Sequence, residues 1–429
     1  MVTTRPRSYQ RANDVRADAQ RLLAANDAAV AWFRSNLATA EEPRRYLVSR
    51  GLGTLVDREW PWRVGYAPPT WSGLTDHLRA AGFSSQELVV AGLAQPTRAD
   101  PSRLIDVFRD RVVFPIRNPA GHVVAFIGRA SDRCVEADPQ LPKYLNTHES
   151  PLYHKDRVLF GVAEQEERIR ASWRPVLVEG PADAIATWLS YSRSGASGAV
   201  AVAPCGTALS GVQARILNAM PGSGDGIVVA FDGDPAGRKA AVAAFDLLRR
   251  PQGRRRLLAA EFPAGADPAE MITRPNGRAQ LRAALRHQTR PLVFAIVDHH
   301  LNRMLARSPQ LLDDIGGRYD AARLLAPRVL DAIDPQEAYW LARHIVERTT
   351  IAERAHDGVS TVMAYAAEGL QRRVDDLTTG HDTGQAAGAS RPPPQGFPRL
   401  RLAQSEPVVD QSSPARPPPG RRPSGPRRA

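Results

Sequence analysis

The sequence predicts an α/β domain built on a parallel, Rossmann-like sheet, with an α+β part before it and helices after it. Short apolar segments rich in valine and isoleucine, such as residues 175–178 and 227–231, alternate with alanine-rich segments of helical length. This alternation is typical of parallel strands joined by right-handed crossover helices. Carboxylates follow two of the strands. One of the connecting helices is expected over residues 207–220, and helical periodicity after residue 277 predicts helices over residues 279–303, 309–333 and 335–354.

The composition favours a polyanionic partner and a reducing environment. Lysine and arginine number 57 against 45 acidic residues, which gives a formal charge of +12. The two cysteines, Cys134 and Cys205, have no paired spacing, so we expect no disulfide framework. No segment reads as a signal peptide or as a membrane span. We therefore expect a soluble, cytoplasmic protein without a membrane partner.

The first part of the chain predicts two helices and a β-hairpin. Apolar residues recur at three- and four-residue spacing over residues 14–37, and a second helix is expected over residues 41–50, ended by Gly51. Residues 112–116 and 123–126 flank a polar turn, as in a hairpin. The arginines on these strands, Arg111 and Arg129 among them, either track a nucleic-acid backbone or solvate the strand faces.

Of the 57 lysines and arginines in the chain, only three are lysines: Lys143, Lys155 and Lys239. Lysine provides a compact point charge, whereas arginine provides a planar fork. We interpret Lys143 and Lys155 as phosphate-binding groups. Surface solvation is the alternative.

Five carboxylates belong to the predicted α/β sheet. The carboxyl ends of parallel strands meet at one edge, and Glu179, Asp232 and Asp234 directly follow strands there. Asp183 and Asp267 lie shortly after the first and the last of the predicted strands. Carboxylates crowded at one edge repel each other unless a hard cation neutralises them, so the pattern indicates magnesium.

These motifs resemble a known family. The Glu-Gly pair at residues 179–180 with Asp183, and the Asp-Gly-Asp-Pro-Ala-Gly segment at residues 232–237, resemble the TOPRIM domain shared by primases, topoisomerases and some nucleases. Segments at residues 111–117, 126–129, 142–146, 151–155 and 159–161 are similar to those that precede TOPRIM in bacterial, DnaG-type DNA primases. The resemblance covers roughly residues 40 to 350.

The resemblance implies template-directed synthesis of short RNA primers on single-stranded DNA from nucleoside triphosphates. It implies a Mg²⁺ cofactor, with Mn²⁺ as a substitute, and a replicative helicase or another replication protein is a candidate partner. We expect no zinc site, because the sequence has no matching set of Cys and His ligands. Glu179 is either a metal ligand or the general acid–base, and both roles stay open. The residues implied are catalytic Glu179, Asp232 and Asp234; metal-binding Glu179, Asp183, Asp232, Asp234 and Asp267; and nucleotide- or template-binding Arg111, Arg129, Lys143, Asn146, Lys155 and Lys239.

We expect five regions along the chain. Residues 1–40 form a helical extension, residues 41–170 the N-terminal subdomain of the catalytic core, residues 171–275 the TOPRIM domain and residues 276–378 a helical subdomain. Residues 379–429 are expected to be a disordered basic tail, since residues 391–429 hold 11 prolines and eight arginines. The tail either keeps the protein soluble or tethers DNA or a partner.

Two departures from the family pattern leave other functions open. Ala269 stands where the pattern has a second acidic residue after Asp267, so a second ion would be held weakly or bridged by Glu270. We also expect neither a zinc-binding module at the N-terminus nor a helicase-binding module after residue 355. These departures favour a non-catalytic, nucleic-acid-binding adaptor as an alternative, and a metal-dependent TOPRIM nuclease is the other.

Overall fold

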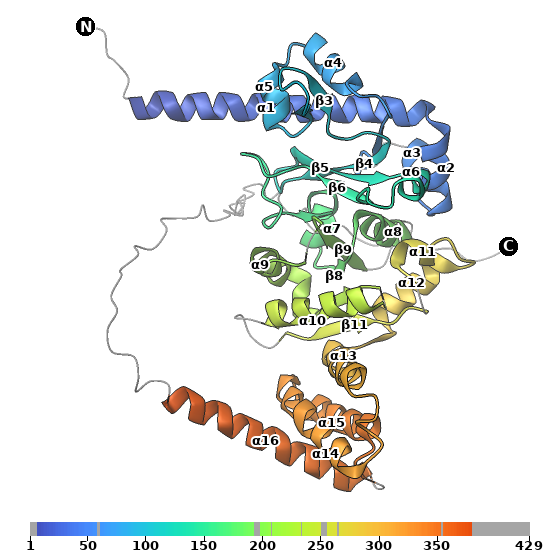
Figure 1. Cartoon of the computed structure of the whole chain (residues 1–429), viewed down its shortest axis with the longest axis vertical. Helices are drawn as coiled ribbons and strands as arrows, with labels where there is room; N and C mark the ends of the chain where they lie inside the picture. The colour runs from blue at the N-terminus through green and yellow to red at the C-terminus, as the bar shows by residue number, and fades with distance from the viewer. Residues whose placement is uncertain are drawn as a thin grey trace, which may run out of the picture. The chain divides into compact units, whose positions relative to one another are not determined.

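The computed structural model describes residues 7–57, 61–192, 198–206, 208–232, 234–249, 255–263, 266–352 and 355–379 (Figure 1). The chain divides into two units, Met1–Asp376 and Leu377–Ala429. All the elements that build the site lie in the first unit. The expected disordered tail falls, from residue 380 onward, outside the described residues.

The N-terminal part consists of helices around a small antiparallel sheet. The two predicted helices are confirmed as α1 (Arg7–Thr39), which begins earlier than expected, and α2 (Glu41–Ser49). The predicted hairpin is confirmed as β4 and β5, within a sheet of order β1-β4-β5-β6. The other elements here are α3 (Thr54–Asp57), β1 (Gly65–Ala67), α4 (Gly73–Ala80), α5 (Ser85–Val90), β2 (Ala94–Pro96), β3 (Leu104–Asp106), β4 (Arg111–Arg117), β5 (Val123–Ala130), α6 (Asp132–Ala137) and β6 (Tyr144–Asn146).

The α/β part is a six-stranded sheet of order β12-β11-β10-β8-β9-β7. Its four central strands are parallel, as predicted, but β7 and β12 pair antiparallel at the edges, so the sheet is mixed rather than purely parallel. Both edge strands are two or three residues long, and their signals are too short to read from periodicity. The strands are β7 (Leu159–Phe160), β8 (Arg174–Val178), β9 (Ala199–Pro204), β10 (Ile227–Ala230), β11 (Leu257–Ala260) and β12 (Thr289–Pro291).

Helices connect these strands. The helix predicted from residue 207 starts only at Gly211, because the Ser210 hydroxyl accepts a hydrogen bond from the Gln213 N–H (3.0 Å) and caps it there. The helices are α7 (Glu166–Arg170), α8 (Pro181–Tyr191), α9 (Gly211–Ala219), α10 (Pro235–Arg249), α11 (Pro268–Met271) and α12 (Gly277–Arg286), with short 3-10 turns at Ala163–Gln165 and Pro221–Asp225.

The chain is then helical over α13 (Leu292–Arg307), α14 (Ile315–Leu325), a 3-10 turn (Ala326–Asp331), α15 (Pro335–Thr349) and α16 (Ala355–Thr379). The single helix predicted over residues 279–303 is wrong. It is split into α12 and α13 because residues 289–291 pair with β11, a tertiary contact that overrides the helical pattern. The helix predicted over residues 309–333 starts instead at Ile315, where Asp314 caps it by accepting the Gly317 N–H (2.9 Å).

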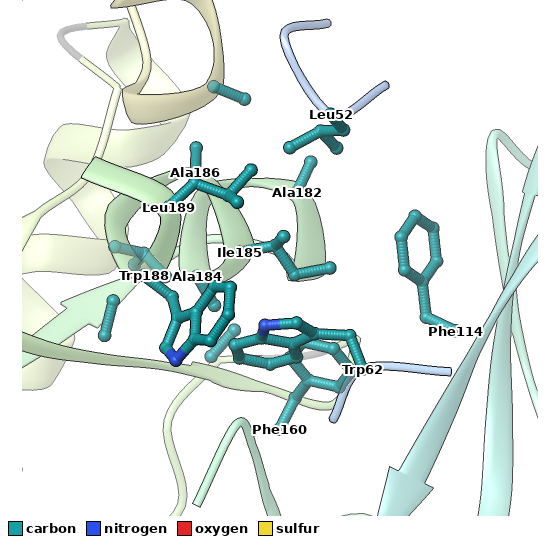
Figure 2. Packing of buried hydrophobic residues seen from close by; sticks show 14 of the residues in the cluster. Leu52, Trp62, Phe114, Phe160, Ala182, Ala184, Ile185, Ala186, Trp188 and Leu189 are labelled. Atoms are coloured by element: carbon teal, nitrogen blue, oxygen red, sulfur yellow. The ribbon is translucent and has the colours of Figure 1, made fainter. Parts of the chain in front are cut away.

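The two faces of the α/β sheet serve different cores. Val176 and Val178 of β8 point into a core shared with α8 and the N-terminal part, whereas Leu177 points into a second core with the helices that follow α12. In the first core, Trp62 stacks on Phe160 with ring centroids 5.4 Å apart (Figure 2). Tyr153 belongs to this shared core and Val158 packs against it, so the loop before β7 is held against the α/β part.

Candidate active site

The carboxyl ends of the central strands carry the predicted acidic residues. Glu179 directly follows β8, and Asp232 and Asp234 follow β10. Asp183 lies in the first turn of α8, and Asp267 lies beyond β11 at the start of α11. Because β8, β10 and β11 are parallel neighbours, the five residues belong to one edge of the sheet, which we call the acidic edge.

Asp183 is buried at the start of α8, with 7% of its surface exposed. One carboxylate oxygen accepts the Gly180 N–H (3.2 Å) and the other accepts the Ala269 N–H (3.3 Å). The side chain therefore joins the turn after β8 to α11. Ala269 itself is fully buried, so this position supplies a main-chain donor rather than a carboxylate.

Glu179 and the β10 turn approach each other closely. The Asp232 N–H donates to Glu179 Oε1 (3.0 Å), and the Gly237 N–H donates to Asp234 (2.6 Å) at the start of α10. A Cβ atom on Gly237 would lie 2.2 Å from the Asp232 carbonyl oxygen and 2.8 Å from Glu179 Oε1. Only glycine fits between these groups.

Asp267 is paired with an arginine from the N-terminal part. Its carboxylate caps α11 by accepting the Glu270 N–H, and its other oxygen receives Arg50 Nη2 at 3.0 Å. The sequence does not reveal Arg50 as a partner of Asp267, because the two residues lie 217 positions apart and no local pattern links them. Glu270 pairs with Arg274 (2.9 Å) and does not turn toward Asp267 as a bridging ligand.

The acidic groups raise one another's pKa values. Burial, followed by the charges of Asp232, Asp234 and Asp267, raises the pKa of Glu179. Burial, followed by Asp267 and Asp232, raises the pKa of Asp183. The pKa of Asp232 is raised for the same reasons, burial first and then Asp267 and Asp234. The edge therefore holds more negative charge than its surroundings stabilise.

Two cations oppose this charge. Lys143 and Arg50 both lower the pKa of Asp232, although burial and the neighbouring carboxylates outweigh them. Lys143 comes from the loop before β6, and its side chain is exposed. The N-terminal part therefore contributes the positive charge of Lys143 to the acidic edge.

The donor set fits a hard divalent cation, because every donor is a carboxylate oxygen and the crowded charge is what a cation neutralises. Among the described residues, no group of three or more histidine, cysteine, aspartate or glutamate side chains is placed to hold a metal ion. The carboxylates accept main-chain N–H groups instead, as Glu179, Asp183 and Asp234 do. Glu179 and Asp234 each use one oxygen in this way, so their second oxygens are the ones that could bind a cation.

The two other lysines lie on the surface. The Lys155 side chain is exposed, while its main chain is fixed by Glu149, which accepts its N–H (3.2 Å), and by Gln213, which donates to its carbonyl (2.9 Å). Lys239 is exposed on α10, five residues after Asp234. The structure therefore leaves both ammonium groups accessible to solvent.

Arg111 is buried, with 4% of its surface exposed, and is not placed to meet a template. Its guanidinium donates to the carbonyls of Gly128 (3.1 Å) and Lys143 (3.3 Å), and burial lowers its pKa. It therefore holds the main chain of Lys143 in position. The hairpin pattern did not reveal this, because it does not show which strand residues point inward.

Arg129 and Asn146 are also largely enclosed. Arg129 is 7% exposed, donates to Asp132 (2.7 Å) and lies over the Tyr46 ring at 4.2 Å, beside a cavity of about 280 Å³. Asn146 packs on the turn after β9, where a Cβ on Gly206 would lie 1.9 Å from its Nδ2. Its Oδ1 is buried with no hydrogen-bond partner in the described part of the chain.

Comparison with known protein families gives two matches in sequence order. Residues 32–166 match the N-terminal domain of the DNA primase catalytic core, and residues 176–272 match a Toprim-like family. The first match covers the small antiparallel sheet, and the second covers the edge that carries Glu179, Asp232 and Asp267.

Curated relatives and solved structures similar to this chain are also DNA primases. The chain is 35% identical over 326 residues to the DNA primase of Mycobacterium tuberculosis, covering 75% of this chain and 47% of that protein. The crystal structure of the RNA polymerase domain of the M. tuberculosis primase DnaG is 32% identical, with a TM-score of 0.60, over 76% of this chain and 98% of that one. A DnaG primase catalytic domain bound to single-stranded DNA is 28% identical, with a TM-score of 0.57, over 78% and 98%.

The chain thus spans about half the length of the curated relatives it matches. No described helix combines the length and apolarity needed to cross a membrane. The solved structure of the polymerase domain, by contrast, is covered almost completely, and the acidic edge lies inside the matched region. The chain belongs to the DnaG-type DNA primase family and contains its catalytic core.

Proposed function

We propose that this protein synthesises short RNA primers on single-stranded DNA by metal-dependent nucleotidyl transfer. The observation that carries the proposal is the acidic edge of Glu179, Asp232 and Asp267 with the exposed ammonium of Lys143 beside it. Negative charge that can hold divalent cations, next to a cation that can hold phosphate, is what phosphoryl transfer needs. Family membership supports the same reaction.

In this reaction a 3′-hydroxyl oxygen attacks the α-phosphorus of a nucleoside triphosphate, and pyrophosphate leaves. Asp232 and Asp234 are the principal metal ligands, with Asp183 and Asp267 in support. Bound Mg²⁺, or Mn²⁺ in its place, would neutralise phosphate charge and lower the pKa of the attacking hydroxyl. Glu179 either joins the ligands or accepts the hydroxyl proton, for which its raised pKa suits it.

The basic residues position the phosphates. Lys143, Lys155 and Lys239 contact the triphosphate or the template through their exposed ammonium groups. Arg111 acts through the main chain of Lys143, which it holds by a hydrogen bond. Arg129 and Asn146 line the surface on which the template lies, although both are mostly enclosed in the protein alone.

We assign regions and partners on the same basis. Residues 41–170 form the N-terminal subdomain, residues 171–275 the TOPRIM domain and residues 276–378 a helical subdomain that closes the core. Template DNA and nucleoside triphosphates are the ligands in this cytoplasmic reaction, and a replicative helicase or other replication protein is the partner.

The test is extension of labelled nucleotides on single-stranded DNA with Mg²⁺ or Mn²⁺, comparing the wild type with Glu179→Gln and Asp232→Ala. We expect products from the wild type and a loss of at least about 100-fold in both variants. Degradation of the template would instead identify a nuclease.

A second candidate is a nucleic-acid-binding adaptor without catalysis. It is favoured by the Arg50–Asp267 ion pair (3.0 Å), which occupies one carboxylate, and by the buried Ala269 where the family pattern has an acidic residue. An adaptor would bind single-stranded DNA but give no product even on a primed template. Calorimetric binding of Mg²⁺ that disappears in Asp232→Ala would tell against it.

A further inference from the structure

The segment after the acidic edge has an arginine pattern that the proposed catalysis does not use. Arginines occur at strict four-residue spacing, and no acidic residue occurs between Glu270 and Asp298. An acidic residue one turn away can balance a surface arginine of a helix, as Glu347 does for Arg343 (2.7 Å) in α15. The arginines of the segment are Arg274, Arg278, Arg282, Arg286 and Arg290.

The spacing puts these side chains in a row on one face of α12. Leu281, Ala284 and Leu285 form the buried face, while Arg286 is exposed and Arg278 and Arg282 are partly exposed. Residues four apart lie about 6 Å apart along a helix axis, so the three arginines of α12 span about 12 Å. We call Arg278, Arg282 and Arg286, with Arg274 before them, the α12 arginine row.

Two members of the row are anchored by the protein. Arg274 pairs with Glu270 (2.9 Å), and Arg282 donates to the Ser190 carbonyl at the end of α8 (2.6 Å). Arg278 and Arg286 have no ion-pair partner among the described residues. The anchored pair is structural, and the other two guanidinium groups are accessible to a ligand.

The row borders a hollow of about 470 Å³ between α8 and α12, lined by Leu189, Ser190, Ile272 and the first turns of α12 (Figure 1 shows α12 beside α8). Burial raises the pKa of Tyr191, and the charges of Arg286, Arg282 and Arg174 oppose that rise. Positive charge therefore continues from α12 to the start of β8.

We propose that the α12 arginine row binds the phosphodiester backbone of a nucleic-acid strand that passes the acidic edge. The row starts seven residues after Asp267, and α11, which Asp267 caps, leads directly into it. Unpaired guanidinium groups at regular spacing contact phosphates without reading bases. The proposal rests on the proposed function, because that function is what brings a nucleic-acid strand to the acidic edge. The row is then a second contact surface for the strand, outside the acidic edge.

The test measures equilibrium binding rather than catalysis, so its result is independent of whether primers are made. The variant is Arg278→Gln/Arg286→Gln, which leaves both anchored arginines intact. The control is Arg303→Gln/Arg307→Gln, which removes the same number of exposed arginines, four residues apart, from α13. Fluorescence anisotropy follows binding of single-stranded DNA, single-stranded RNA and an RNA–DNA duplex, each about 30 nucleotides long, at several salt concentrations.

We expect the α12 variant to bind at least one of these probes about tenfold more weakly, and the slope of log affinity against log salt to fall by about 1.4 for a single strand. Loss for single-stranded DNA assigns the row to the template, and loss for the RNA or the duplex assigns it to the product. Unchanged slopes for all three probes, or an equal change in the α13 control, would overturn the proposal. Circular dichroism of both variants excludes unfolding as the cause.

Discussion

At the residue scale, the geometry of the acidic edge depends on Gly237, which has no side chain to take part in the reaction. Gly237 lies inside α10, where alanine would stabilise a helix by about 1 kcal/mol, yet its Cβ would lie 2.2 Å from the Asp232 carbonyl. We expect Gly237→Ala to displace the turn and to slow primer synthesis by about 100-fold, since small misplacements at a reacting centre have effects of this size. Gly224→Ala is the control, because its added Cβ meets no atom within 4 Å. Equal rates in the two variants would contradict this role.

The charges at the same edge predict how stability responds to pH. The pKa values of Asp183 and Glu179 are raised in the folded protein, so the folded state binds these protons more tightly than the unfolded state. Their contribution to stability is present below the unfolded pKa, about 4, and is lost as pH rises through the folded pKa values.

If Mg²⁺ binds this edge as proposed, it neutralises the ionised carboxylates, so its stabilising effect should grow with pH. We expect the difference in melting temperature between Mg²⁺ and EDTA samples to be small near about pH 5 and to increase toward about pH 8. Asp232→Asn should remove the difference, and Asp225→Asn, on an exposed turn before β10, should keep it. A difference that does not depend on pH would show that the metal binds elsewhere.

At the element scale, the sequence predicted the parts of the fold whose signals are local. The parallel strands, α8, α10 and the hairpin were predictable because each has a clear period or cap. The edge strand β12 was not, because only its pairing with β11 makes Thr289–Pro291 a strand. The same limit applies to the site: strand ends predicted Glu179 and Asp232, but the inward orientation of Arg111 and the approach of Arg50 depend on tertiary contacts.

The junction between α2 and α11 gives an element-scale prediction. Arg50, just after α2, pairs with Asp267 and helps to lower the pKa of Asp232. Arg50→Met should raise the pKa of Asp232, so the acid limb of the pH–rate profile for primer synthesis should move to higher pH, by about half a unit. Arg45→Met, an exposed change on α2 itself, should leave the profile unchanged. An acid limb that stays in place in Arg50→Met would mean that Asp232 does not control it.

At the scale of the whole molecule, the regions recognised as separate families share one core. The first hydrophobic core joins Leu47 of α2 and Phe114 of β4 to Ile185 and Trp188 of α8. Figure 2 shows Phe114, Ile185 and Trp188 in this core. A boundary near residue 170 therefore separates two sequence families but runs through this core. Lys143 is held near Asp232 by this packing, since the N-terminal sheet and the α/β sheet are fixed to each other.

This arrangement predicts that the two parts unfold together. Trp62 is 1% exposed and packs between Phe160 and Trp188, with ring centroids 5.4 and 6.0 Å away, so Trp62→Ala should cost about 3–5 kcal/mol. Because the core is shared, hydrogen exchange should accelerate to a similar extent in β4–β5 and in α8, and thermal unfolding should remain one transition. Trp71→Ala, at a 66% exposed position, should cost no more than about 1 kcal/mol. Faster exchange confined to one part, or two separate transitions, would show that the parts fold independently and that another contact places Lys143 at the acidic edge.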